Sequence, residues 1–170
     1  MNQNTVWWSV ALVVVLIIAL LFVYQNGART NSTQNTDTGA GAEMAVTSVV
    51  VAFGGSLDMV SLLAPAASVA ESMEANYAPY VAPELLAQWE SDPAHAPGRL
   101  TSSPAPDHIE VSSAQANADG TYTVLGRVIE TTSAATATST GSGSYPVTIR
   151  LENRDGSWLI TQFQGYPPQR

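Results

Sequence analysis

The chain has 170 residues with 6 basic and 14 acidic side chains, which gives a formal net charge of −8 at neutral pH. An anionic chain is repelled by phosphate groups, so this composition argues against nucleic acid and against an anionic lipid surface as partners of its water-soluble part. Cysteine is absent, which excludes disulfides, thiol chemistry and lipid attachment through a cysteine.

The first element along the chain is an uncharged apolar run from Val6 to Tyr24. Its nineteen residues cover roughly 28 Å as a helix, and the aromatic residues at both ends suit the headgroup region of a bilayer. The run predicts a transmembrane anchor within residues 1–24, with the lipid bilayer as its partner. A cleaved signal peptide is the alternative, but no Lys or Arg precedes the run. The nearest candidate cleavage site, Asn26-Gly27-Ala28, has Asn26 where a small residue is required.

A segment rich in Ser, Thr, Asn and Gly follows from Gln25 to Ala45 and is typical of a flexible linker. The positive-inside rule, applied to Arg29 alone, would place the C-terminal side in the cytoplasm. The solvated linker and the anionic domain behind it favour the opposite orientation. Basic residues that are all Arg, together with abundant Ala, are typical of a GC-rich bacterial genome. We therefore expect a bacterial single-pass membrane protein with an extracytoplasmic domain in the cell envelope.

The remaining residues, 46–166, are long enough for one domain, and its first third is predicted to be helical. Thr47 is a candidate N-cap for a helix whose apolar positions recur every three or four residues as far as Leu63 or Ala64. Gly54-Gly55 interrupts this helix. We interpret the pair as a place where another element packs closely against bare backbone, with a bend as the alternative.

Prolines delimit two further predicted helices. Pro65 and Pro83 suit first helical positions, and Pro79 and Pro93 end the segments that follow them. The stretch between residues 92 and 107 contains four prolines and should be extended and irregular. The apolar positions of the two helices are Val69, Met73 and Tyr77, and Leu85, Leu86 and Trp89.

After residue 107 the apolar period changes to two, which predicts four β-strands. Asp119-Gly120 and Asp155-Gly156 mark tight turns within the first and second strand pairs. Residues 132–144 are mostly small and polar and should form a loop between the second and third strands. Helices followed by antiparallel strands predict an α+β fold with the helices on one face of the sheet. The alternating apolar positions are Ile109, Val111, Tyr122, Val124, Val128, Tyr145, Val147, Ile149, Leu151, Trp158 and Ile160.

This order of elements, closed by a last strand containing Asp155-Gly-Ser-Trp-Leu-Ile160, resembles the NTF2-like (SnoaL-like, cystatin-like) superfamily over about residues 45–165. The second strand, Tyr122-Thr-Val-Leu-Gly126, supports the resemblance. The stretches Pro83-Glu-Leu-Leu86, Ala96-Pro-Gly-Arg-Leu-Thr-Ser-Ser-Pro104 and Asp107-His-Ile-Glu110 are similar to envelope proteins of Gram-positive bacteria. The resemblance implies three helices packed on a four-stranded curved sheet, which form a cone with a pocket. Because the superfamily contains both enzymes and non-catalytic binding domains, the fold does not choose between them.

An enzyme of the ketosteroid-isomerase or SnoaL type needs a carboxylate or His in an apolar pocket and a donor aimed at the developing enolate. Asp107 or His108, with Tyr77, are the candidates for these roles. A solvated strand edge explains Asp107, His108 and Glu110 equally well, and we prefer that interpretation. No metal-ligand or cofactor motif occurs, so we predict neither a metal nor a cofactor.

The residues with the strongest binding pattern lie in the proline-bounded stretch before the first strand. An Arg with three neighbouring hydroxyls can bind a carboxylate, phosphate or sugar, or can pin the loop to the domain. An ion pair of Arg99 with Asp107 or Glu110 is the simpler explanation of its charge. A third interpretation is a docking surface for another envelope protein. The candidate ligand- or partner-binding residues are Arg99, Thr101, Ser102, Ser103, Asp107 and His108.

Taken together, the sequence predicts a membrane-anchored extracytoplasmic domain without enzymatic activity that binds a partner protein or a small ligand. Homodimerisation through the open face of the sheet, which the family resemblance implies, is compatible with this prediction. The alternative is a pocket enzyme that uses an Asp or His as acid and base.

Overall fold

The computed structural model describes residues 39–132 and 143–165, so the predicted anchor Val6–Tyr24 and most of the predicted 132–144 loop lie outside the described residues. The chain divides into two units, Met1–Gly41 and Ala42–Arg170, and the second unit contains the α+β fold. The first element of the described residues is a helix over residues 39–54, called the long helix below. The short 3-10 helix η1 (Leu57–Met59), helices α2 (Ala66–Tyr77) and α3 (Pro83–Ser91), and the 3-10 helix η2 (Pro93–His95) follow it.

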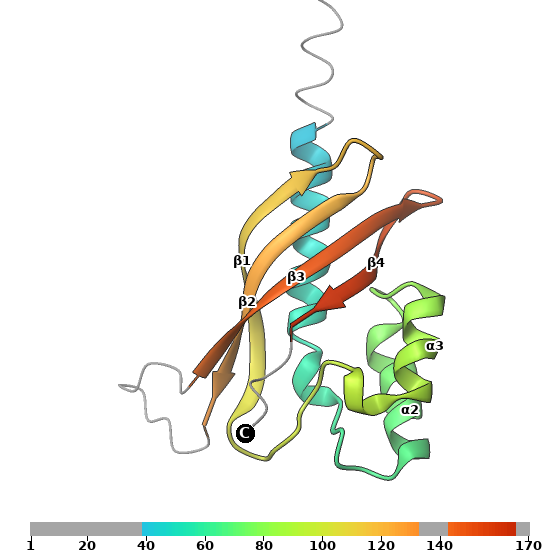
Figure 1. Ribbon diagram of the computed structural model, residues 1–170, viewed down its shortest axis with the longest axis vertical. Helices are drawn as coiled ribbons and strands as arrows, with labels where there is room; N and C mark the ends of the chain where they lie inside the picture. Colours follow the sequence, from blue (N-terminus) through green and yellow to red (C-terminus); the bar gives the residue numbers. More distant parts are fainter. Residues whose placement is uncertain (1–38, 133–142, 166–170) are drawn as a thin grey trace, which may run out of the picture. The chain divides into compact units, whose positions relative to one another are not determined.

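Four antiparallel strands form one sheet in the order β1-β2-β3-β4 (Figure 1). They are β1 (Ala105–Ala116), β2 (Tyr122–Thr131), β3 (Gly143–Arg154) and β4 (Ser157–Gln164). Both predicted turns are confirmed, because Gly120 has a φ of 82° and Asp155 and Gly156 have φ values of 53° and 87°. The positive φ values at both central residues of the second turn match the right-handed twist of the flanking strands. The predicted α+β class with three helices and a four-stranded antiparallel sheet is confirmed.

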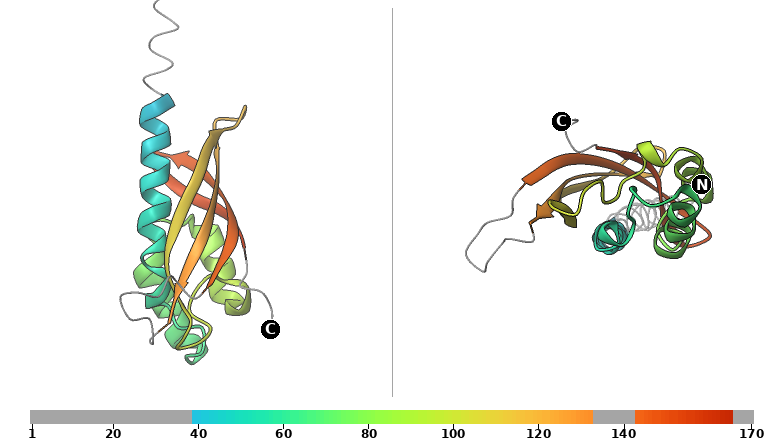
Figure 2. Two further views of the ribbon diagram at one scale, coloured as in Figure 1. Left: turned by 90° about the vertical axis from the view of Figure 1, so that its left-hand side faces the viewer. Right: turned by 90° about the horizontal axis from the view of Figure 1, so that it is seen from below.

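The sheet curves around the long helix, which runs along one face of it (Figure 2). The strand register places alternate residues on that face, as in the pairs Ile109 with Val128 and Val124 with Ile149. Val50 of the long helix is fully buried, as are Val124 and Ile149. This arrangement follows from the sequence, because a helix stripe of period 3.6 and strands of period two each have one apolar face to bury.

Gly54 ends the long helix where the helix meets β1. A Cβ atom at Gly54 would lie 2.6 Å from the backbone nitrogen of Ile109 and 2.9 Å from its Cβ. At Gly55 the nearest atom to such a Cβ is the Ala52 oxygen at 3.6 Å, which is ordinary contact. The predicted close packing against a bare backbone is therefore confirmed for Gly54, and Gly55 has no part in it.

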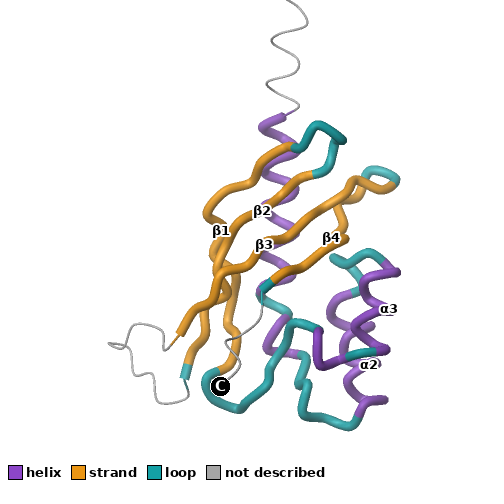
Figure 3. Tube along the Cα trace, in the orientation of Figure 1, coloured by secondary structure: helices purple, strands orange, loops and turns teal. Residues whose placement is uncertain are grey.

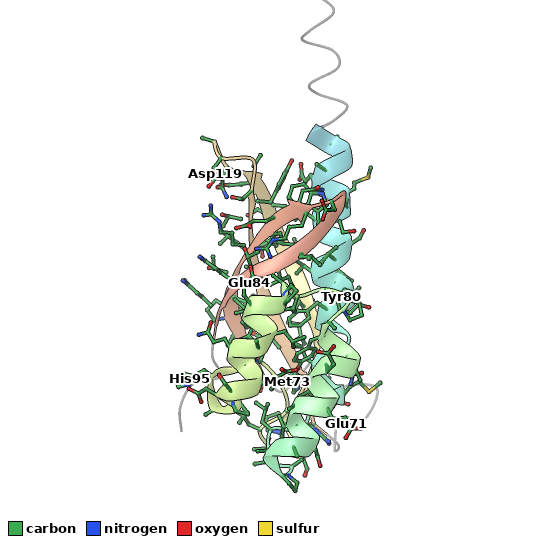
Figure 4. The ribbon with its side chains drawn as sticks, turned by 90° about the vertical axis from the view of Figure 1, so that its right-hand side faces the viewer. Glu71, Met73, Tyr80, Glu84, His95 and Asp119 are labelled. Carbon is green, nitrogen blue, oxygen red and sulfur yellow. The ribbon has the colours of Figure 1, made fainter. Side chains whose placement is uncertain are left out.

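An aromatic cluster joins the long helix to α2, α3 and β4. The ring of Phe53 lies 5.0 Å from Tyr77, 6.3 Å from Trp89 and 5.9 Å from Phe163, measured between ring centroids. Backbone hydrogen bonds also join β4 to the segment after α2, since the Ile160 N–H donates to the Tyr80 oxygen at 2.8 Å. Figure 4 shows Met73 of α2 turned toward the sheet, whereas Glu71 and His95 lie on the outside. The predicted inward faces of α2 and α3 are therefore confirmed.

The structure differs from the predictions at several boundaries. The long helix already includes residues 39–45, which composition assigned to the linker, so Thr47 lies inside the helix and is not its N-cap. The helical period assigned Leu63 or Ala64 to the buried stripe. Ala64 is half-buried against the core, whereas Leu63 is 68% exposed. The helix ends at residue 54, so its period no longer applies to the residues before Pro65. Val111 and Trp158 are half-buried, in contrast to the other predicted inward positions of the sheet.

One helical span among the described residues, Gly39–Met59, which comprises the long helix and η1, is long and apolar enough to cross a membrane by length and composition. It is a different segment from the predicted anchor. Val46, Val50 and Phe53 within it are fully buried in the core of the domain, so one side of this helix already belongs to a folded structure. The membrane anchor over Val6–Tyr24 stays a prediction.

Candidate functional site

Two loop segments that are far apart in the sequence pair with each other beyond the end of the long helix (Figure 3). The Arg99 N–H donates to the Val60 oxygen at 2.8 Å, and the Leu62 N–H donates to the Arg99 oxygen at 3.0 Å. These bonds form a short parallel bridge between Ser61 and Arg99. Gly98 permits the approach, because a Cβ there would lie 2.9 Å from the Val60 oxygen. The loop that carries the candidate binding residues is therefore anchored through its backbone.

The partner of the Arg99 guanidinium is Asp58 in η1. The Nε atom lies 3.7 Å from the Asp58 Oδ1 atom, which is an ion-pair distance but too long for a hydrogen bond. Nε is also buried and makes no hydrogen bond. The prediction that Arg99 forms an ion pair with Asp107 or Glu110 is wrong, because its partner is Asp58. The reason is that the parallel bridge brings Arg99 beside η1, a contact between residues about 40 positions apart that local spacing does not encode.

The hydroxyl groups of the same loop have different surroundings. Thr101 donates its hydroxyl to the Pro104 oxygen at 2.6 Å and so closes the loop on itself. Ser102 and Ser103 are exposed. Of the two roles considered for these hydroxyls, the Thr101 contact supports pinning of the loop.

Asp107 and His108 lie at the start of β1, beside a register shift between Pro106 and His108. The His108 Nδ1 atom lies 2.6 Å from the Asp107 Oδ2 atom, and Nε2 lies 3.8 Å from the Glu110 Oε1 atom. All three side chains are between 44% and 63% exposed. Glu110 also stands opposite Arg127 on β2. This is the solvated strand edge that the sequence analysis preferred.

Tyr77, the third residue of the acid–base hypothesis, has another partner. Its hydroxyl is buried and donates to the Pro97 oxygen at 2.8 Å. The structure therefore does not place the Tyr77 hydroxyl as a hydrogen-bond donor to Asp107 or His108. Among the residues that the structure describes, Thr121 is the one polar or charged residue that is buried. The face of the sheet that the helices cover is lined by the aliphatic core and the aromatic cluster.

Burial changes the acidity of two tyrosines in this interior. Desolvation raises the pKa of Tyr77 far above its ordinary value, and the Tyr145 charge adds to the effect. Desolvation and, to a smaller extent, the Glu130 charge raise the pKa of Tyr145 from 10.0 to about 12. Both groups are held as neutral phenols, which suits a packed core.

These shifts predict a loss of stability in alkaline solution. The folded state retains the two phenolic protons at a pH where the unfolded chain releases them, so the stabilisation is complete below about pH 10 and declines as the pH rises toward about 12. We expect the free energy of unfolding, measured by denaturant titration from about pH 9 to about pH 12, to fall less steeply in Tyr145→Phe than in the unaltered chain. Equal slopes would show that Tyr145 titrates alike in both states.

The paired loops also carry apolar side chains in contact with solvent. Met59 is 65% exposed, Leu63 68% and Leu100 42%. Together with Asp58 and Arg99 these residues are called the paired-loop surface. The sequence predicts Arg99 as a binding residue but none of the three apolar residues, because the helical period assigns Leu63 or Ala64 to the buried stripe. The available signal was Pro65, which disfavours helix in the residue before it.

No protein-family model matches the sequence, and no curated protein or solved structure shows significant similarity to the chain. The relationship to NTF2-like domains therefore stays a prediction that rests on the order of elements and the motifs of the sequence.

Proposed function

We propose that this chain is a membrane-tethered, extracytoplasmic domain of NTF2-like type that docks a partner protein on the paired-loop surface. The observation that carries the proposal is the exposure of Met59, Leu63 and Leu100 on two segments whose backbones are joined by hydrogen bonds. Apolar side chains held on a fixed frame lose little conformational freedom when a partner covers them. The tether is the apolar run Val6–Tyr24, and the envelope location rests on composition.

The charges around the paired-loop surface indicate which kind of partner would fit it. Asp58 of this surface is 55% exposed, and the Ser72 hydroxyl of α2 donates to the Met59 oxygen at 3.2 Å, which brings α2 beside the surface. Glu71 and Glu74 on α2 are exposed as well. A complementary partner would present apolar side chains flanked by Lys or Arg.

The apolar residues of the interior support docking over catalysis. A proton-transfer enzyme would need its acid or base inside an apolar pocket. The aromatic cluster of Phe53, Tyr77 and Trp89 occupies the space between the helices and the sheet. Asp107 and His108 lie at the solvated edge.

The proposal is tested with a photo-crosslinking amino acid at position 63 of the whole chain in its own membrane. We expect a specific adduct whose yield falls roughly tenfold or more in the double variant Met59→Ser and Leu100→Ser, because two apolar contacts are lost. The matched control is Leu125→Ser, since Leu125 is 44% exposed on the opposite face of the sheet. That control should leave the yield unchanged, and both variants should keep the thermal unfolding midpoint. An adduct that persists in the double variant would overturn the proposal. Deleting residues 6–24 should release the chain from the membrane fraction.

A further inference from the structure

The guanidinium group of Arg99 makes no hydrogen bond within residues 39–132 and 143–165. Its Nε atom is buried and lies 3.7 Å from the Asp58 Oδ1 atom, beyond hydrogen-bond distance. The side chain as a whole is 36% exposed, so the end of the guanidinium that carries the two Nη nitrogens faces solvent. Arg99 therefore presents unused hydrogen-bond donors on the paired-loop surface.

The other arginines in the described part of the chain are engaged differently. Each of them donates hydrogen bonds through its guanidinium group: Arg127 to Ser144, Arg150 to Asp119, and Arg154 to Glu84 and Glu152. The chain has 14 acidic side chains, so carboxylates are abundant. An arginine that reaches none of them with a hydrogen bond is unusual in this protein.

The backbone holds Arg99 in a fixed place. Its N–H donates to the Val60 oxygen at 2.8 Å, and its own oxygen accepts from the Leu62 N–H at 3.0 Å. A donor group on such a frame loses less freedom on binding than one on a mobile loop. Because Nε is buried, a ligand reaches the guanidinium from its Nη end. The two Nη groups offer parallel N–H donors whose spacing matches the two oxygens of a carboxylate.

The charges nearby favour a carboxylate over a phosphate. Asp58 lies beside the guanidinium, and Glu71 and Glu74 are exposed on the neighbouring α2. Their repulsion of a bound anion grows with the charge of that anion, which is −1 for a carboxylate and about −1.5 to −2 for a phosphate group. The exposed side chains of Met59 and Leu100 on the same surface suit a ligand that has an apolar group next to its carboxylate.

We propose that Arg99 binds a carboxylate of the docked partner, supplied by an acidic side chain that adjoins an apolar one. This inference rests on the proposed function, because it takes the ligand to be part of the partner protein. It adds an acidic residue to the apolar and basic residues already expected on the partner. Asp58 is a competitor for the same guanidinium, so removing its charge should strengthen binding of the carboxylate.

The test uses the whole chain in lipid nanodiscs with methionine labelled at its ¹³C methyl group. The probe is the acetylated and amidated dipeptide aspartyl-leucine, and its matched control is asparaginyl-leucine, which has the same shape without the charge. We expect the aspartyl probe to shift the Met59 methyl resonance with half-saturation at a roughly millimolar concentration. Met44, which is exposed on the long helix, and Met73, which is fully buried, should not shift.

Substitutions at the ion pair should act in opposite directions. Arg99→Gln should abolish the shift, and Arg99→Lys should weaken binding about fivefold, because it keeps the charge and loses the paired donors. Asp58→Asn should tighten binding by about threefold. All three variants should keep the thermal unfolding midpoint, because both side chains are partly exposed. If the pair served the structure alone, the Arg99 and Asp58 variants would change in the same direction.

Equal shifts from the aspartyl and asparaginyl dipeptides would overturn the inference. A response to inorganic phosphate at lower concentrations than to the aspartyl dipeptide would overturn the carboxylate as the ligand class. In the photo-crosslinking experiment at position 63, Arg99→Gln should lower the adduct yield about tenfold. An adduct unchanged by Arg99→Gln but lost in the Met59→Ser and Leu100→Ser double variant would overturn this inference alone. An adduct that persists in the double variant would overturn the docking proposal, whereas the dipeptide titration tests Arg99 in either case.

Discussion

Replacing Phe53 by alanine should lower the free energy of unfolding by about 3–5 kcal/mol. The side chain is fully buried, and its ring contacts Tyr77, Trp89 and Phe163, which come from three different elements. The cavity left by the ring cannot be closed by a shift of one element without opening a gap against another. The loss is a large share of the stability of an ordinary domain, so the thermal midpoint should fall by roughly 10–20 °C.

Thermal unfolding followed by circular dichroism in the near ultraviolet measures the fall in the midpoint, because this signal reports the packing of the aromatic cluster. Leu125→Ala is the matched control, since Leu125 is also a large apolar residue but is 44% exposed. Its effect should stay within about 0.5 kcal/mol. A Phe53→Ala variant as stable as this control would mean that the long helix does not meet α2 and α3 as described.

The fold could be predicted from the sequence wherever a local rule acts. Pro65 and Pro83 mark the starts of α2 and α3, because a proline at a first turn leaves no backbone donor unpaired. The two Asp-Gly pairs fix the hairpins because Gly120, Asp155 and Gly156 adopt positive φ values that such turns require. Alternation in β2 and β3 gives the buried face without knowledge of the helices.

The features that the sequence did not predict depend on tertiary contacts. Residues 39–45 have the composition of a linker, yet they continue a helix that the domain stabilises by burying Val46 and Val50. Packing of an apolar face outweighs the low helix propensity of glycine in such a segment. The pairing of Arg99 with Asp58 likewise depends on a bridge between distant loops.

Only part of the candidate site could be predicted from the sequence, because the rest depends on tertiary contacts. Arg99 and its neighbours stand out by residue type, so chemistry pointed to the loop. The exposure of Met59 and Leu63 follows only from the place where the long helix ends. Leu63 would lie on the buried stripe if the helix continued as far as residue 64, so composition alone does not reveal a docking surface.

Gly54 and Gly55 offer the sharpest test of how the long helix sits on the sheet. Gly54→Ala should cost about 1–3 kcal/mol, because its Cβ would lie 2.6 Å from the backbone nitrogen of Ile109 and something must move. Gly55→Ala meets no atom closer than 3.6 Å, and it should be neutral or stabilise by about 0.4–1 kcal/mol through the unfolded state. Helix propensity alone predicts that both alanines stabilise. Opposite signs in a denaturant titration would therefore demonstrate close packing of Gly54 on β1, whereas equal stabilisation would place Ile109 elsewhere.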